Sequence, residues 1–326
     1  MKRVFGKVLA FIYGLVVQVW RASYEWFPLR QKKVSARVIS VGNITWGGTG
    51  KTPLATKLAQ LLSEQGKKVA VLTRGYGRDE VQELQKKLPG IPVVVGRDRV
   101  RTAQKAIAEH GAEILILDDG FQHIRLRRDL DVVALNSTDP FGPGGLLPLG
   151  TLREPLENLS RAGVFVLTKC NIGSKNTHWI KQKLNVVKPN AIIFEAVHQP
   201  LGFVNPLKNT RMENPAIRNC KVGAISGIGD PYSFEKTVEL LGGTILLAAR
   251  YEDHHSFTKS EIVQFIKQCR SLGLREAITT EKDFFRIEPI LTKHLKDSLR
   301  DFTFWVLEIE FQISDEEDFL RRCLNS

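Results

Sequence analysis

A glycine-rich segment near the N-terminus carries residue types that could bind the phosphates of a nucleotide. It runs from Gly42 to Thr52 as Gly-Asn-Ile-Thr-Trp-Gly-Gly-Thr-Gly-Lys-Thr, between an apolar run and a helical pattern. Backbone N–H groups at such a strand-to-helix turn can cradle phosphates. Lys51 would then reach the β- and γ-phosphates, and the Thr52 hydroxyl would be a ligand of Mg²⁺. Thr45 occupies the first glycine position of the usual G-x-x-x-x-G-K-[ST] pattern. The segment predicts a triphosphate site formed by Gly47, Gly48, Thr49, Gly50, Lys51 and Thr52.

A pair of acidic residues ends a later apolar run and could hold a metal ion. The run Ile114–Leu117 is followed directly by Asp118 and Asp119. Metal ions in open parallel sheets lie at the carboxyl ends of strands, and carboxylate oxygens are ligands that Mg²⁺ prefers. We therefore expect both aspartates to lie near Thr52.

Three further strings combine charges and possible proton acceptors. They are Arg74-Gly75-Tyr76-Gly77, Leu152-Arg153-Glu154-Pro155 and Glu252-Asp253-His254-His255, the last with adjacent histidines in a chain that has seven. Phosphoryl transfer needs an acceptor site and a base, and these strings offer candidates. Taken singly, each string is more often a turn, an ion pair or a solvated loop than a functional site.

The elements that must position these residues alternate between strands and helices. Strands are expected at Arg37–Val41, Val69–Leu72, Ile91–Val95, Ile114–Leu117, Val132–Leu135 and Val164–Leu167, with helices after the glycine-rich turn and over about Val100–Glu109. Continuous apolar runs without alternation are typical of strands that are buried on both faces of a parallel sheet. The pattern therefore predicts an α/β fold with a P-loop NTPase-like, doubly wound parallel sheet.

A second, smaller α/β domain is expected after a change of texture near residues 188–190. The chain there becomes more polar and is interrupted by prolines. Strands are then expected at Lys221–Ile225, Thr244–Ala248, Ala277–Thr280 and Phe302–Ile309, and helices after Pro231, at about Lys259–Leu272 and at Asp315–Leu324. We expect an N-terminal segment at residues 1–33, a kinase-like core at 34–188 and a C-terminal domain at 189–326.

The basic excess is concentrated at the N-terminus. The chain has 47 Lys and Arg against 35 Asp and Glu, a net charge of +12, and residues 1–50 hold eight of these cations and one acid, Glu25. An apolar run from Val8 to Trp20 would rise only about 20 Å as a helix, too short for a hydrocarbon core of about 30 Å. Interfacial aromatic residues follow this run. We favour a membrane-docking helix over an amphipathic core helix or a signal peptide. A signal peptide is disfavoured because cleavage at Ala22 would place Trp20 at the −3 position, where a small residue is needed.

Composition narrows the function further. The chain is 43% hydrophobic and 25% charged, which is typical of a folded protein rather than a disordered one. The cysteines are about fifty residues apart, so a zinc knuckle, a thioredoxin-type site and a disulfide scaffold are disfavoured. The basic balance indicates an anionic partner, and its position beside an apolar run favours lipid over nucleic acid.

At this point the motifs together resemble one family, the tetraacyldisaccharide 4′-kinases. The resemblance rests on the phosphate loop with its non-glycine first position and on six strings in order: Arg74-Gly75-Tyr76-Gly77, Val95-Gly96-Arg97-Asp98-Arg99, Asp118-Asp119-Gly120-Phe121-Gln122-His123, Leu152-Arg153-Glu154-Pro155, Asp253-His254 and Thr280-Glu281-Lys282-Asp283. It implies ATP-dependent phosphorylation, with Mg²⁺, of the 4′-hydroxyl of the tetraacyldisaccharide 1-phosphate precursor of lipid A, giving lipid IVA. It further implies a peripheral protein on the anionic lipid surface of the cytoplasmic face of the inner membrane, without nucleic acid or an obligate protein partner.

The resemblance also implies roles for single residues. Lys51 contacts the phosphates and acts in catalysis, and His254 and Asp79 form a base dyad. The family's Gly-Asp-Glu-Pro block is Arg78-Asp79-Glu80-Val81 here, and the stretch that separates it from Arg-Gly-Tyr is missing. The metal would be held by Thr52, Asp118, Asp119 and Glu154, and the acceptor would contact Asn43, Arg74, Gln122, His123 and Arg153.

Two other classes of function compete with a lipid kinase. A membrane-associated P-loop ATPase or GTPase switch could use Leu167-Thr168-Lys169 as a base-recognition strand, but the sequence has no Asn-Lys-x-Asp there. A basic nucleic-acid binder would explain the net charge but not the neighbouring apolar run. A kinase would need its lipid acceptor for turnover, a switch would not, and a nucleic-acid binder would respond to polynucleotide with a steep salt dependence.

Overall fold

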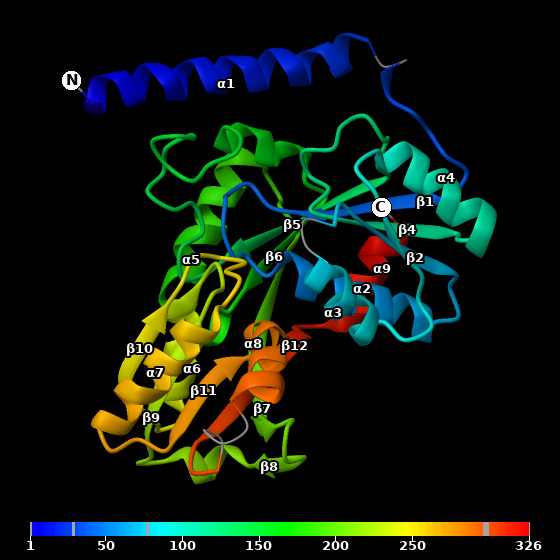
Figure 1. Cartoon of the computed structure of the whole chain (residues 1–326). Helices are drawn as coiled ribbons and strands as arrows, with labels where there is room; N and C mark the ends of the chain where they lie inside the picture. Colours follow the sequence, from blue (N-terminus) through cyan, green and yellow to red (C-terminus); the bar gives the residue numbers. More distant parts are fainter. Residues whose placement is uncertain (1, 28–29, 76–77, 296–299, 326) are drawn as a thin grey trace. The chain divides into compact units, whose positions relative to one another are not determined.

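The chain forms two compact units, and one strand, β7 (Ile193–Asn205), begins in the first and ends in the second. The computed structural model describes residues 2–27, 30–75, 78–295 and 300–325, but not the side chains of residues 2–5, 25, 78–80 and 215. The first unit comprises Met1–Val197 and Ile313–Ser326, and the second comprises His198–Gln312. Figure 1 shows the elements in order of sequence.

The sheet of the first unit is parallel and carries the phosphate loop at its centre. Its strand order is β7-β6-β5-β1-β4-β2-β3, and each pair of neighbours in that order runs parallel. Strands β2, β4, β5 and β6 are buried throughout, as their continuous apolar runs predict. The bounds are Arg37–Gly42 for β1, Val69–Thr73 for β2, Val93–Val95 for β3, Ile114–Asp118 for β4, Leu130–Asn136 for β5, Val164–Thr168 for β6 and Ile193–Asn205 for β7.

Helices of this unit begin and end where local chemistry dictates. Helix α4 starts after Asp98, whose side chain accepts from the N–H groups of Val100 and Arg101, and it ends at Gly111 with φ of 61°. Its Ala103 packs into a core with the neighbouring strands. The helices of this unit are α1 Lys2–Trp26, α2 Lys51–Glu64, α3 Arg78–Lys87, α4 Arg99–His110, α5 Cys170–Val187 and α9 Glu316–Asn325, with a 3₁₀ helix at Leu156–Arg161.

Helix α1 has one packed face and one exposed apolar face. Cβ atoms added at Gly6 and Gly14 would lie 2.7 Å from leucine side chains of the 146–149 loop, so these glycines permit close approach. The Tyr13 hydroxyl donates to the carbonyl of Arg153 at 2.9 Å. Among the described residues, no helix combines the length and hydropathy needed to cross a bilayer. The exposed face carries Val8, Leu9, Phe11, Ile12, Leu15, Val16, Val19 and Trp20.

The second unit is also α/β, with helices on both faces of its sheet. Its strand order is β10-β9-β11-β12, followed by the later part of β7, which pairs antiparallel with β8. One core lies between the sheet and helices α7 and α8, and another lies beneath α6. Thr258 and Glu261 form a capping box that starts α7. The bounds are Thr210–Met212 for β8, Lys221–Ser226 for β9, Thr244–Arg250 for β10, Glu276–Thr280 for β11, Thr303–Ile313 for β12, Pro231–Leu240 for α6, Lys259–Ser271 for α7 and Glu281–His294 for α8.

The expected α/β class and parallel sheet are confirmed, but the limits of the units differ from those expected. From the sequence we expected a domain boundary at residue 188 and a C-terminal tail that belongs to the second domain. The change of unit occurs instead within β7, and α9 belongs to the first unit. There Glu316 pairs with Lys57 at 2.7 Å, and Phe319 packs against Phe194 at a centroid distance of 5.4 Å. The proline-interrupted segment forms a 13-residue strand, β7, which the sequence did not predict. Buried and partly exposed residues are interspersed along it, so it has no continuous apolar run.

Candidate active site

The phosphate loop joins β1 to α2 and takes a shape that its glycines allow. Gly47 and Gly50 have φ of 121° and 82°, a region that side chains with a Cβ rarely adopt. Asn43 is fully buried, and its amide nitrogen donates to the Thr45 carbonyl at 2.6 Å and to the Thr49 hydroxyl at 2.9 Å. No side chain of the described residues caps the N-terminus of α2. The first N–H groups of α2 therefore remain available to an anion.

The loop is held from a second side by the end of β6. The Thr168 hydroxyl donates to the carbonyl of Thr49 at 2.9 Å, and the Lys169 ammonium donates to the carbonyl of Gly48 at 3.0 Å. Both residues are buried, and Lys169 has φ of 57°. From the sequence we considered this Thr-Lys pair only as part of a possible base-recognition strand. In the structure the pair supports the phosphate loop.

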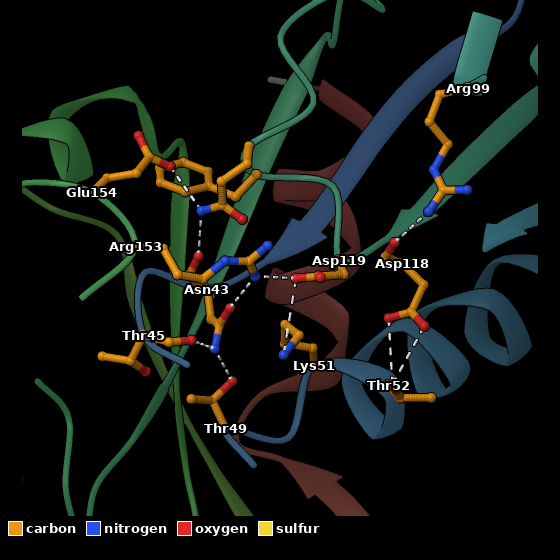
Figure 2. Close-up of polar contacts among 12 residues, drawn as sticks. Asn43, Thr45, Thr49, Lys51, Thr52, Arg99, Asp118, Asp119, Arg153 and Glu154 are labelled. Atoms are coloured by element: carbon orange, nitrogen blue, oxygen red, sulfur yellow. Dashed lines mark hydrogen bonds and ion pairs between the residues drawn. The ribbon is translucent and has the colours of Figure 1, made fainter. Parts of the chain in front are cut away.

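Two oxygen ligands suited to Mg²⁺ meet at the edge of the sheet. The hydroxyl of Thr52, in the first turn of α2, lies 3.3 and 3.5 Å from the carboxylate oxygens of Asp118, at the end of β4. Strand pairing sets this arrangement, since Val41 of β1 is directly opposite Asp118. Figure 2 shows the pair beside the loop. No group of three or more His, Cys, Asp or Glu in the described part of the chain could hold a metal. A site with few protein ligands fits Mg²⁺, which binds through one or two carboxylates plus phosphates and water.

Asp119 belongs to a separate charged group that faces the loop. Its Oδ1 lies 2.7 Å from Arg153 Nη1 and 3.9 Å from Lys51 Nζ (Figure 2). Burial alone would raise the pKa of Asp119, but the charges of Lys51 and Arg153 outweigh it and hold the pKa below its usual range. Arg153 also donates to the side-chain oxygen of Asn43 at 3.3 Å. The group places two cations next to the loop, with one carboxylate that orients them.

Glu154 lies in an interior network rather than among the expected metal ligands. The residue is 3% exposed, and its two side-chain oxygens accept four hydrogen bonds. Arg161 donates to both oxygens at 2.8 and 3.2 Å, Asn158 donates to one at 2.8 Å, and Gln122 donates to the other at 2.7 Å. Acceptors already satisfied in this way are poor metal ligands without rearrangement. The sequence could not show this, because a carboxylate that binds a metal and one that binds arginine look alike in sequence.

The residues expected to contact the acceptor have different surroundings. Gln122 and Asn43 are linked by a hydrogen bond, in which the Gln122 amide donates to the carbonyl of Asn43 at 2.9 Å. His123 lies in a strongly positive environment. Burial and the charge of Arg99 lower the pKa of His123 to about 4, Asp119 opposes this, and Arg74 adds to it. Arg99, which was noted only as part of a motif, is 3% exposed and donates to the carbonyl of Asp118 at 3.3 Å.

The two members of the expected base dyad belong to different units. His254 follows β10 in the second unit and has φ of 65°. Asp79 lies in α3 of the first unit, and its side chain is outside the described part of the chain. Their pairing therefore stays a prediction.

Comparisons with known proteins decide the family. The model of the tetraacyldisaccharide-1-P 4′-kinase family matches residues 3–85 and 79–326. The chain belongs to this family. The two matched segments overlap at residues 79–85, which begin with Asp79, where the sequence lacks the stretch before the Asp-Glu block.

Similar proteins support the same assignment over most of the chain. A tetraacyldisaccharide 4′-kinase of Halothermothrix orenii is 34% identical, over 95% of this chain and 89% of its own. One of Anaeromyxobacter dehalogenans is 34% identical, over 93% and 85%. The crystal structure of the "apo" form of LpxK from Aquifex aeolicus in complex with ATP is 27% identical with a TM-score of 0.73, and the match covers 99% of both chains. The resemblance inferred from the motifs is confirmed, and this chain is a kinase by family.

Proposed function

We propose that this kinase transfers the γ-phosphoryl group of ATP to the 4′-hydroxyl of a tetraacyldisaccharide 1-phosphate, the precursor of lipid A. The observation that carries the proposal is the phosphate loop, in which α2 begins with Lys51 and Thr52 beside the Asp118 carboxylate. The family match supplies the substrate, and the ATP in the related crystal structure supports the phosphoryl donor. A P-loop switch has no comparable support.

Phosphate binding follows from the loop and its neighbours. The N–H groups at the start of α2 and the Lys51 ammonium neutralise the triphosphate. Arg153, oriented by Asp119 and Asn43, supplies a second cation. Cations that are fixed before the reaction stabilise charge that develops on the transferring group without reorganisation in the transition state.

The metal site would be formed by Thr52 and Asp118. When bound, Mg²⁺ would neutralise charge on the β- and γ-phosphates and align them. Asp119 is also a candidate ligand of the metal, and its contacts to Lys51 and Arg153 orient these two cations as well. We assign no metal contact to Glu154 because its oxygens are already occupied.

A base is needed because a sugar hydroxyl is a poor nucleophile. We assign this role to a dyad of His254 and Asp79, in which an imidazole and a carboxylate would act together. The assignment is based on their sequence motifs. General base assistance contributes about 10²–10⁴ to rate. Asn43, Arg74, Gln122, His123 and Arg153 are the proposed contacts to the acceptor.

The proposed location is the cytoplasmic face of the inner membrane, with α1 resting on anionic lipid. The eight exposed apolar side chains of α1 lie on the face opposite to its packed glycines. Lys7 also lies on this helix, whereas Arg21 donates to the side-chain oxygen of Asn158 at 2.8 Å. A helix with one broad exposed apolar face is typical of helices that lie in the plane of an interface.

The test is ATP turnover by the full chain with and without the tetraacylated disaccharide in mixed micelles. A kinase of this class should hydrolyse little ATP alone and should form ADP and phosphorylated lipid in equal amounts. His254→Ala and Asp79→Ala should each lower kcat with little change in KM for ATP. The double variant should be hardly slower than either single variant, because the effects on kcat of residues that act together are not additive. Acceptor-independent turnover would contradict the proposed function, and losses that multiply would contradict the dyad.

A further inference from the structure

Charged groups surround the ring of His254 within the second unit. Ring Nδ1 lies 3.3 Å from Nη2 of Arg286, and ring Nε2 lies 3.6 Å from Oδ2 of Asp253. Lys282 Nζ lies 3.5 Å from Nε2 and 3.9 Å from the other oxygen of Asp253. Each ring nitrogen therefore has a specific polar neighbour.

Arg286 is itself fixed by a buried partner. Its side chain is 5% exposed, and its Nη1 lies 3.4 Å from Oδ1 of Asp283, which is fully buried. The Thr280 hydroxyl donates to the other oxygen of Asp283 at 2.7 Å. Burial raises the pKa of Asp283, while Thr280, the N–H of Gly227 and the Arg286 charge oppose the rise. A buried pair with this many partners gives the guanidinium one defined position.

Gly227 ties the backbone of His254 to the same pair. Its carbonyl accepts from the His254 N–H at 3.2 Å and from Arg286 Nη1 at 3.4 Å. A Cβ at Gly227 would lie 3.2 Å from Cβ of His255 and 3.4 Å from Oδ1 of Asp283, tighter than most Cβ contacts. The left-handed backbone of His254 and the orientation of Arg286 thus depend on one carbonyl group.

The chemistry of the donors decides the tautomer of the ring. A guanidinium can only donate hydrogen bonds, so Nδ1 of His254 must accept and carries no proton. The proton of the neutral ring is then on Nε2. The Lys282 ammonium, also a pure donor, lies farther from the ring, 3.5 Å from Nε2. We therefore take the shorter Arg286 contact as the hydrogen bond to the ring, and the Asp253 carboxylate, 3.9 Å from Lys282 Nζ, as the partner of the ammonium.

We propose that Arg286, held by Asp283, is a positioning residue that fixes His254 as its Nε2–H tautomer. This inference rests on the proposed role of His254 in phosphoryl transfer. With Nδ1 occupied, the ring can only donate, through Nε2–H, so the proton acceptor of the proposed dyad is the Asp79 carboxylate.

The tautomer is measured by a long-range ¹H–¹⁵N correlation spectrum of the full-length protein, with the His254 signals identified by their loss in His254→Gln. We expect the Nε2–H pattern in the wild type. In Arg286→Met, which keeps an unbranched apolar stem but removes the donors, we expect a mixture of tautomers. A protonated or Nδ1–H ring in the wild type, or an unchanged spectrum in Arg286→Met, would overturn the proposal.

Kinetics separates positioning from folding. Arg286→Met should lower kcat by about 10- to 100-fold, as expected when a reacting group is misplaced, with KM for ATP little changed. Arg286→Lys keeps the charge but not the planar fork, so it should recover only part of the loss. Arg275→Met is the matched control, because Arg275 forms an exposed pair with Asp301 in the same unit. Thermal denaturation of each variant identifies any that fail to fold, and Arg286→Lys serves as the test if Arg286→Met does.

The outcomes distinguish this inference from the proposed function. Full activity in His254→Gln would remove His254 from the mechanism while leaving the tautomer assignment intact. A mixed tautomer in Arg286→Met with wild-type kcat would overturn the positioning role.

Discussion

Replacing Glu154 by glutamine tests whether this residue is structural or a metal ligand. Each of its carboxylate oxygens accepts one bond from Arg161 and one from an amide, of Asn158 or Gln122. A glutamine presents one oxygen and one NH₂ group, so in either orientation two of the four bonds are lost and N–H groups face each other. Arg161, whose side chain is 16% exposed, loses the carboxylate charge with which it pairs at 2.8 Å.

The expected cost follows from these losses. Hydrogen bonds to charged groups contribute about 1.5–3 kcal/mol each, and removing one partner of a buried ion pair costs about 3–5 kcal/mol. The two figures describe the same contacts, so we expect Glu154→Gln to lower the free energy of unfolding of the first unit by about 3–5 kcal/mol. For a unit of this size that corresponds to a fall in Tm of roughly 6–20 °C.

Tryptophan fluorescence during urea denaturation is the appropriate assay. Four of the five tryptophans belong to the first unit, at positions 20, 26, 46 and 179. Trp179 packs against Phe141 of the hydrophobic cluster that includes Leu152 and Leu159. Glu195→Gln is the matched control, because Glu195 pairs with Lys181 at the surface of the same unit, where we expect a loss of less than about 1 kcal/mol.

A double-mutant cycle and a magnesium titration decide between the two roles. Combining Glu154→Gln with Arg161→Met should cost less than the sum of the single changes, because the second removes the charge that the first leaves unpaired. Unchanged stability in Glu154→Gln, with activity that returns as Mg²⁺ is raised, would refute our assignment and restore Glu154 as a metal ligand.

Four further outcomes follow from the structure. Lys51→Ala should lower kcat by roughly 10²–10³, the usual cost of losing one fixed electrostatic contact, and near wild-type turnover would contradict the phosphate-loop assignment. Asp118→Ala should raise the Mg²⁺ concentration needed for half-maximal activity, and a purely kcat effect at all Mg²⁺ concentrations would argue against a ligand role. Phe11→Glu with Val16→Glu, on the exposed face of α1, should move the protein from vesicles of anionic lipid to the supernatant without changing ATP binding; deletion of residues 1–26 should do the same, and unchanged sedimentation would exclude docking through this face. The pKa of His123 is lowered to about 4 from 6.5, so the folded state binds its proton less readily, and its contribution to stability is complete above pH 6.5 and is lost as pH falls towards 4. In His123→Gln the decline of unfolding free energy between pH 7 and 4 should be shallower, and an identical decline would show that the ring is not shielded.

The sequence by itself determined the features that depend on neighbours along the chain. The phosphate loop was readable because its lysine, threonine and glycines must follow one strand and open one helix within about ten residues. Strands β2, β4, β5 and β6 were readable because burial on both faces requires uninterrupted apolar runs. Ordered motifs along the whole chain were sufficient to indicate the family. In each case the physical requirement acts within one element.

Only the tertiary structure decided which distant residues share a contact. Lys169 and Gly48 are 121 positions apart, and Gln122 and Glu154 are 32 apart. Arg286 and His254 are likewise 32 apart. Such pairs are set by the order of strands in the sheet and by the loops at their ends, neither of which leaves a periodic trace in the sequence. Burial then determines what a charged side chain does, because a carboxylate removed from water must find donors, and in Glu154 those donors are protein groups rather than a metal ion.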